Sequence, residues 1–169
     1  DWSSGTRRDG YDKAHSLFYE GWIARRIADD VRSNKFRDAR GKENYGLLEF
    51  DDLSEYRAKI EEPLNIDWGD ITVYKCPTWT QGPVLLQMLR ILENFDVKGL
   101  GHNSVDYIHL LIETVKLAYA DRERYYGDPD FDDVPVDRLL SRGYAKQRIR
   151  LIDMSKASSE SAAGEIAVG

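Results

Sequence analysis

The chain has 169 residues, of which 41% are hydrophobic and 32% are charged, and this balance favours a folded segment with a packed core over a disordered one. Its formal net charge of −6 argues against a nucleic-acid-binding protein, which needs an excess of Lys and Arg to replace the counterions of the phosphate backbone. No apolar run approaches the roughly 20 residues of a membrane-spanning helix, and a single cysteine, Cys76, excludes an internal disulfide.

The first sixty residues predict a polar start, one helix and an exposed loop. Residues 1–12 are rich in Asp, Ser, Gly and Arg, have no apolar signal-peptide core, and are expected to form a flexible lead-in. The stretch 33–46 is polar and aperiodic, which is typical of an exposed loop. Asp52 and Glu55 have the spacing of a capping box and predict a short helix. Between lead-in and loop, apolar residues recur at helical spacing and predict one continuous helix: Leu17, Phe18, Trp22, Ile23, Ile27 and Val31.

Residues 63–76 change from helical to strand periodicity and predict a β-hairpin with its reversal at Gly69. A two-stranded hairpin is marginal in water, so this one should dock on something larger. Apolar side chains on both of its faces predict cover on both sides. In the isolated chain we expect an apolar patch around Trp68, Tyr74 and Trp79, and therefore either self-association through this region or a mobile hairpin.

A turn and a helix are predicted next. Pro83 fits the first position of a helix, where the missing N–H costs nothing, and the helix should end near Asn94. The helix N-terminus at 80–82 is a kind of position that can bind anions. A tight strand-to-helix turn is the favoured interpretation, because one glycine is weak evidence for more. The predicted buried stripe of this helix is Leu85, Leu86, Leu89 and Leu92.

A longer helix follows the loop that contains Gly99 and Gly101. Asn103 or Ser104 can cap its start, and Gly127 is expected to end it in the left-handed conformation. Asp121 and Arg124 are expected to pair on its exposed side. Its predicted buried face steps by three and four residues: Val105, Ile108, Leu111, Ile112, Val115, Ala118 and Tyr119.

The last third of the chain predicts a broken helical stretch and a tail. Pro135 opens the helical stretch, which is interrupted near Gly143 and ends around Asp153. Residues 154–169 are small, polar and aperiodic, and they are expected to form a flexible linker.

No catalytic, cofactor-binding or metal-binding residue can be assigned from the local sequence. The acidic turn 128–133 begins like a calcium loop, but Asp133 stands where a glycine is required and Leu139 where a bidentate Glu is required. A solvated turn is therefore favoured over a cation site. Cys76 and the serines have no partnered base nearby, so no nucleophile is assigned. The histidines lack metal-ligand spacing and are interpreted as packing or surface residues: His15, His102 and His109.

Several words of the sequence occur together in one enzyme family. They are QMLRILENF, GHNS, AYADR and GDPDFDDVP, preceded in the same order by FYEGWIARRIADDV, FDDLSEYRAKIEEPL and ITVYKCP. Through them, residues 17–153 resemble the C-terminal part of the large subunit of the γ-glutamyltranspeptidase (glutathione hydrolase) family. The chain departs from the family at 77–83, where PTWTQGP replaces a Pro-Pro-Pro-Ser-Ser/Gln-Gly-Gly turn, and in a longer loop at 34–45. These departures indicate a divergent branch.

The resemblance implies a mainly α-helical domain with one β-hairpin, a fragment of an N-terminal-nucleophile hydrolase large subunit. Residues 13–153 would be that domain, and 154–169 the linker before an autocleavage site. The resemblance further implies that the nucleophile is a Thr outside this chain, freed by self-cleavage, with its own amine as base. On this interpretation the chain alone is an inactive scaffold that holds no catalytic residue and no cofactor.

The implied partners are a small subunit that carries the Thr, the rest of the large subunit, and a small-molecule γ-glutamyl or related amide substrate. Neither nucleic acid nor a membrane span is expected. Family members suggest a periplasmic or secreted location, and the sequence leaves a cytoplasmic one open. The alternative to the enzyme is a non-catalytic helical interaction module from a degenerate branch of the family.

Overall fold

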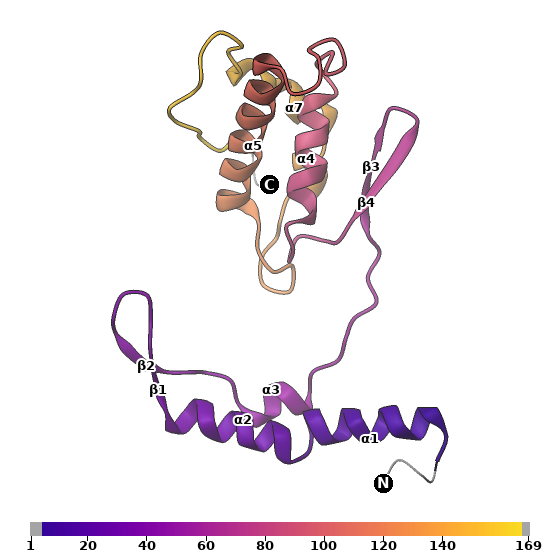
Figure 1. The fold of residues 1–169 in the computed structure, drawn as a ribbon, viewed down its shortest axis with the longest axis vertical. Coiled ribbons are helices and arrows are strands. Elements are labelled where there is room, and N and C mark those ends of the chain that lie inside the picture. Colours follow the sequence, from indigo (N-terminus) through magenta and orange to yellow (C-terminus); the bar gives the residue numbers. More distant parts are fainter. Residues whose placement is uncertain (1–4, 167–169) are drawn as a thin grey trace. The chain divides into compact units, whose positions relative to one another are not determined.

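The computed structural model describes residues 5–166, which fall into two compact units that divide between Ile60 and Glu61 (Figure 1). Residues 1–4 of the predicted lead-in and 167–169 of the predicted linker lie outside the described residues. Helices predominate in both units, as the sequence predicts, but each unit also contains a two-stranded antiparallel hairpin. The hairpin of the first unit was not expected.

Two helices form most of the first unit where one was predicted. They are α1 (Arg7–Tyr19) and α2 (Trp22–Ser33), and they pack on each other. The break between them lies at Gly21, where a Cβ atom would stand 2.6 Å from the carbonyl oxygen of Leu17. The apolar spacing continues across this break, and periodicity therefore could not reveal it.

The helix α1 also begins earlier than the apolar pattern indicates. Its N-cap is Thr6, whose Oγ1 accepts a hydrogen bond from the Asp9 N–H at 3.3 Å. The Thr6 N–H in turn donates to Asp9 Oδ2 at 2.6 Å, which completes a capping box. Residues 7–12, expected to belong to a flexible lead-in, are therefore helical.

The predicted loop of the first unit contains a small hairpin of β1 (Lys35–Arg37) and β2 (Glu43–Tyr45). Every residue of both strands is exposed, as expected for this stretch. Because neither face is buried, the strands show no apolar alternation in the sequence.

The short helix α3 (Phe50–Ser54) closes the first unit. Its capping box joins Glu49 and Asp52, so Asp52 is the third residue of the helix. The predicted box of Asp52 with Glu55 is therefore wrong, and the helix begins and ends about one turn earlier than expected.

The predicted hairpin of the second unit is confirmed. It pairs β3 (Leu64–Trp68) with β4 (Ile71–Lys75), and Gly69 makes the turn with a φ of +60°. Ile66 is buried opposite Val73, and both strands pack on the helix that follows. On the opposite face of the hairpin Tyr74 is exposed, as is the nearby Trp79, so the described residues cover mainly the face of Ile66 and Val73. Ile71, at the turn end of that covered face, is also exposed.

Three helices make the core of the second unit: α4 (Gly82–Leu92), α5 (Val105–Tyr125) and α7 (Arg142–Arg148). The helix α4 packs against both of the others (Figure 1). Two short pieces, α6 (Val136–Leu139) and the 3-10 turn η1 (Ile149–Leu151), flank α7 and confirm the predicted broken helical stretch. The side chains that meet between the three core helices are Ile91, Leu117 and Ala145, with Phe95, Ile149 and Ile152 around them.

The buried face of α5 is not the predicted one. Most of the expected face is exposed: Val105, Ile108, Ile112, Val115 and Tyr119. The buried residues are Leu110, Glu113, Thr114, Leu117, Ala118 and Asp121. Half of the residues that truly face the core are therefore polar, and the apolar stripe faces outward. The helix α4 shows the same on a smaller scale, because Leu85 is exposed and Gln87 is buried.

The start of α5 was predicted correctly and the reason for its end was not. Ser104 caps the helix, accepting a hydrogen bond from the Tyr107 N–H at 3.0 Å. The helix ends because Tyr126 adopts an extended conformation, and Gly127 is not left-handed. A side chain at Gly127 would instead overlap the carboxylate of Asp132, which explains the glycine.

Candidate functional site

The most developed polar site is a buried ion pair between α5 and α7. Asp121 is 0% exposed, and its Oδ2 lies 3.2 Å from Nε of Arg148, which is 3% exposed. The same carboxylate accepts hydrogen bonds from the side-chain amide of Gln87 and, at 2.7 Å, from the Gly164 N–H. The predicted surface pair of Asp121 with Arg124 is therefore wrong.

Three tyrosines surround this ion pair. The Tyr126 hydroxyl donates to Gln87 Oε1 at 3.0 Å, and the Tyr125 hydroxyl donates to the Gly164 carbonyl oxygen at 2.6 Å. Burial, and secondarily the charge of Asp121, raises the pKa of both Tyr126 and Tyr144 above the ordinary range of tyrosine. Both hydroxyls therefore stay protonated at neutral pH, and that of Tyr126 donates to Gln87.

The buried site is organised for structure and not for chemistry. Arg148 neutralises Asp121, and its Nη2 donates to two backbone carbonyls, Leu117 O at 3.3 Å and Ala162 O at 2.7 Å. A general base must be able to reach its substrate, and a carboxylate that is fully enclosed and fully paired cannot. We therefore assign Asp121 no catalytic role.

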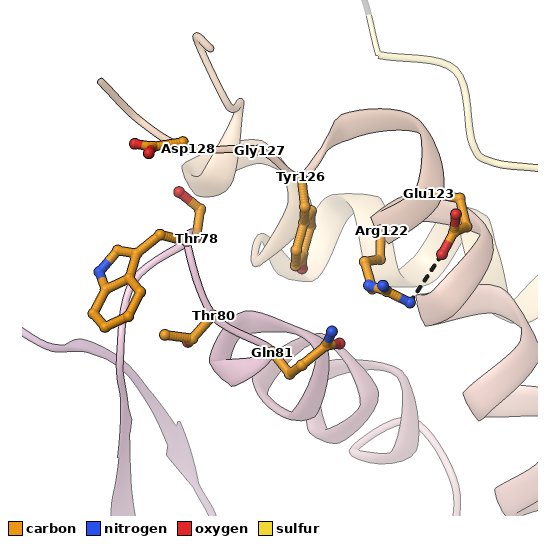
Figure 2. Close-up of a pocket in the computed structure, with 9 residues that line it drawn as sticks. Thr78, Thr80, Gln81, Arg122, Glu123, Tyr126, Gly127 and Asp128 are labelled. Atoms are coloured by element: carbon orange, nitrogen blue, oxygen red, sulfur yellow. Dashed lines mark ion pairs between the residues drawn. The ribbon is translucent and has the colours of Figure 1, made fainter. Parts of the chain in front are cut away.

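An open cleft of about 540 Å³ lies where α4 begins and α5 ends (Figure 2). Figure 2 shows Arg122 and Glu123 on one side of it, joined by an ion pair of 2.8 Å, with Thr80 and Gln81 at the start of α4. Asp128 adds a second acidic side chain to the lining. Because the only guanidinium in the lining is paired and two carboxylates accompany it, the cleft does not present a site for an anion.

The segment 80–82 is the tight turn that the sequence favours. The Thr80 hydroxyl accepts a hydrogen bond from the Gly82 N–H at 3.0 Å and donates to the Pro77 carbonyl at 2.9 Å. A side chain at Gly82 would overlap the carbonyl oxygen of Cys76, so this glycine allows close approach of two backbones. The Gly82 N–H is thus already satisfied, which argues against an anion site there.

The acidic turn is held by hydrogen bonds of its own. Asp128 Oδ1 accepts from the Asp130 N–H at 2.9 Å, and the Asp128 carbonyl accepts from the Asp132 N–H at 2.8 Å. Among residues 5–166, no cluster of three or more His, Cys, Asp or Glu side chains is placed to hold a metal ion.

The three histidines have packing and surface contacts. His109 Nε2 lies 2.8 Å from the Asp153 carbonyl oxygen. The rings of His15 and Tyr19 have centroids 4.7 Å apart. The ring of His102 lies 6.1 Å from that of Tyr107.

Among residues 5–166, none of the helices combines the length and the apolar character that a membrane-spanning helix requires.

Solved structures share this fold. A γ-glutamyltranspeptidase from Helicobacter pylori superposes with a TM-score of 0.75 at 30% identity, over 88% of this chain and 40% of that one. A cephalosporin acylase from Bacillus halodurans superposes with a TM-score of 0.70 at 32% identity, over 86% of this chain and 25% of that one. The fold is therefore that of a large-subunit portion of an N-terminal-nucleophile hydrolase.

The sequence comparisons narrow the class to one family. The sequence model of γ-glutamyltranspeptidase matches residues 10–167. A glutathione hydrolase proenzyme from Escherichia coli is 39% identical over 153 residues, which are 89% of this chain and 25% of that protein. The chain belongs to the γ-glutamyltranspeptidase family, as its sequence motifs indicate, and it spans about a quarter of the length of this curated relative.

Proposed function

We propose that this chain is the helical scaffold of an enzyme that cleaves γ-glutamyl or related amides, and that the nucleophile lies outside residues 1–169. The observation that carries the proposal is membership of the family combined with coverage of about a quarter of its relatives. It is supported by the buried site, where the carboxylate of Asp121 is paired with Arg148 and enclosed.

The proposed reaction is acyl transfer. The hydroxyl of an N-terminal Thr attacks the amide carbonyl, the amine leaves, and the resulting ester passes its acyl group to water or to another amine. The Thr's own α-amine takes the hydroxyl proton and passes it to the departing amine. A partner subunit that carries this Thr, together with the rest of the large subunit, would complete the active site.

The proposal is tested with the longer protein that contains this chain. We expect it to release the amine from a chromogenic γ-glutamyl anilide and to yield a new N-terminal Thr on sequencing of its fragments. Replacing that Thr by Ala should abolish both. A longer protein that neither cleaves itself nor turns over the anilide would favour the non-catalytic interaction module.

The chain of residues 1–169 alone is expected to release no amine from the same anilide. The physical reason is that the Thr which serves as nucleophile in the proposed enzyme is not among residues 1–169, and that the buried carboxylate of Asp121 cannot contact a substrate. The matched control is the longer protein at equal molar concentration. Turnover by the rigorously purified chain would contradict the assignment of scaffold.

We also expect the isolated chain to self-associate, or to carry a mobile hairpin, because apolar side chains stay uncovered on β4 and α5. Ile71 and Tyr74 are exposed on the hairpin, and Val105 and Ile112 on the helix. Sedimentation over a range of concentrations measures the association. Amide exchange measures how strongly the backbone N–H groups of the hairpin are protected from solvent. Strong protection throughout 66–76 in a dilute monomer would show that the hairpin needs no partner and that the module interpretation is better.

A further inference from the structure

The segment 158–166, which the sequence predicts to belong to a flexible linker, lies against α5 and α7 in the structure and is held at both ends. At its start, the Ser158 carbonyl accepts from Lys116 Nζ at 2.8 Å, and the Ser158 N–H donates to Glu113 Oε1 at 3.2 Å. At its end, Ile166 is buried with Leu139 and Tyr144. We call residues 158–166 the strap.

Between these ends, the main chain of the strap carries the contacts. The Ala162 carbonyl accepts from Arg148 at 2.7 Å, and the Gly164 N–H donates to Asp121 at 2.7 Å. The Tyr125 hydroxyl donates to the Gly164 carbonyl at 2.6 Å and accepts from the Ile166 N–H at 3.3 Å. Both members of the buried ion pair thus bind the main chain of the strap: the Asp121 carboxylate accepts from the Gly164 N–H, and the Arg148 guanidinium donates to the Ala162 carbonyl.

The small residues of the strap have a steric reason. A Cβ atom on Gly164 would stand 2.8 Å from Cζ of Tyr144 and overlap its hydroxyl. The surface formed by α5 and α7 therefore accepts a backbone with no side chain at this point. At Gly164 the missing side chain is therefore a requirement for close approach of the backbone to Tyr144.

We infer that α5 and α7 form a binding groove for main chain, occupied by residues 158–166 of this same chain, and that the groove fixes the position of the chain as far as Ile166. Tyr125, Asp121 and Arg148 are the positioning residues of this groove. In the proposed function the strap precedes the self-cleaved bond and would hold it in place, a consequence that rests on that proposal. The groove itself does not depend on it.

The test uses the full chain of residues 1–169, one variant of the groove and one variant of the strap. Tyr125→Phe removes the hydroxyl that contacts Gly164 and Ile166, and Gly164→Ala disturbs the strap without changing the groove. Tyr119→Phe is the matched control, since it removes a hydroxyl from the exposed side of the same helix. Amide exchange followed by mass spectrometry measures the protection of the strap from solvent. The rate of cleavage by a Glu-specific protease after Glu160 and Glu165 measures its accessibility independently.

We expect the strap to be protected in the parent chain and in Tyr119→Phe. In Tyr125→Phe its exchange and cleavage should accelerate by about tenfold, the effect of losing roughly one net hydrogen bond, while the protection of α4 and α5 stays unchanged. Gly164→Ala should accelerate both at least as much. If Tyr125→Phe also reduces the protection of α4 and α5, the inference is judged on Gly164→Ala, which should accelerate exchange and cleavage of the strap while the helices stay protected.

Two results would overturn the inference. One is exchange of the strap in the parent chain as fast as in a free peptide of the same sequence. The other is a strap that is equally protected in Gly164→Ala and in the parent. Neither result bears on turnover by the longer protein, so failure of the groove and failure of the proposed enzyme are separate findings.

Discussion

Asp121→Ala is expected to lower the free energy of unfolding of the second unit by about 3–5 kcal/mol, the usual cost of removing one partner of a buried ion pair. The substitution leaves the guanidinium of Arg148, which is 3% exposed, without its counter-charge. It also removes the acceptor of the Gln87 side-chain amide and of the Gly164 N–H. Urea unfolding followed by far-ultraviolet circular dichroism measures the change.

Glu123→Ala is the matched control for Asp121→Ala. Glu123 is two positions further along α5, its side chain is 71% exposed, and its ion pair with Arg122 lies at the surface. Surface ion pairs of this kind contribute less than about 1 kcal/mol, so the unfolding midpoint should hardly move. Equal shifts for the two variants would show that the carboxylate of Asp121 is solvated and that the buried pair is not formed.

The sequence predicted those features of the fold that a few neighbouring residues decide. Pro83 marks the start of α4, Ser104 caps α5, and Gly69 makes the hairpin turn. Each of these signals acts within about one turn of the chain, so no tertiary information is needed to interpret it. The family motifs were likewise sufficient to identify the family, which the comparisons confirm.

The buried polar site could not be predicted from the sequence, because its partners are distant along the chain. Gln87 lies 34 residues from Asp121, and Gly164 lies 43 residues from it. Periodicity counts apolar residues as buried and polar ones as exposed. On α5 this rule selected the wrong face, since Glu113 and Asp121 are buried and paired. The one available signal was the AYADR motif, which places Asp121 among family words without saying what it contacts.

The strap was missed for a related reason. A segment without apolar period and rich in small residues normally buries too little apolar surface to offset the conformational entropy lost on ordering. Here hydrogen bonds from charged side chains of other elements, Arg148 and Lys116, to its carbonyl oxygens stabilise the ordered segment. Composition alone therefore cannot predict order in a segment whose main chain is bound by charged side chains from distant parts of the sequence.

Leu110→Ala is expected to destabilise the second unit by about 2–5 kcal/mol, because it leaves a cavity at a fully buried position. Leu110 is 0% exposed on α5, whereas Ile112, two residues on, is 50% exposed. Ile112→Ala should therefore cost less than about 1 kcal/mol, since half of its side chain is already in water. The pair is well matched, because both variants truncate a four-carbon aliphatic side chain in the middle of one helix. Urea midpoints measured on the same day give the comparison.

The order of these two effects decides which face of α5 is packed. The apolar pattern of the sequence places Ile112 in the core, so a larger midpoint shift for Ile112→Ala than for Leu110→Ala would contradict the structure and restore the sequence-based face. The same pair also tests the proposed longer protein. If the remainder of that protein covers the outward face of α5, Ile112→Ala will cost more there than in the isolated chain, because its side chain will then be buried. The cost of Leu110→Ala should be the same in both, since its surroundings lie within the second unit.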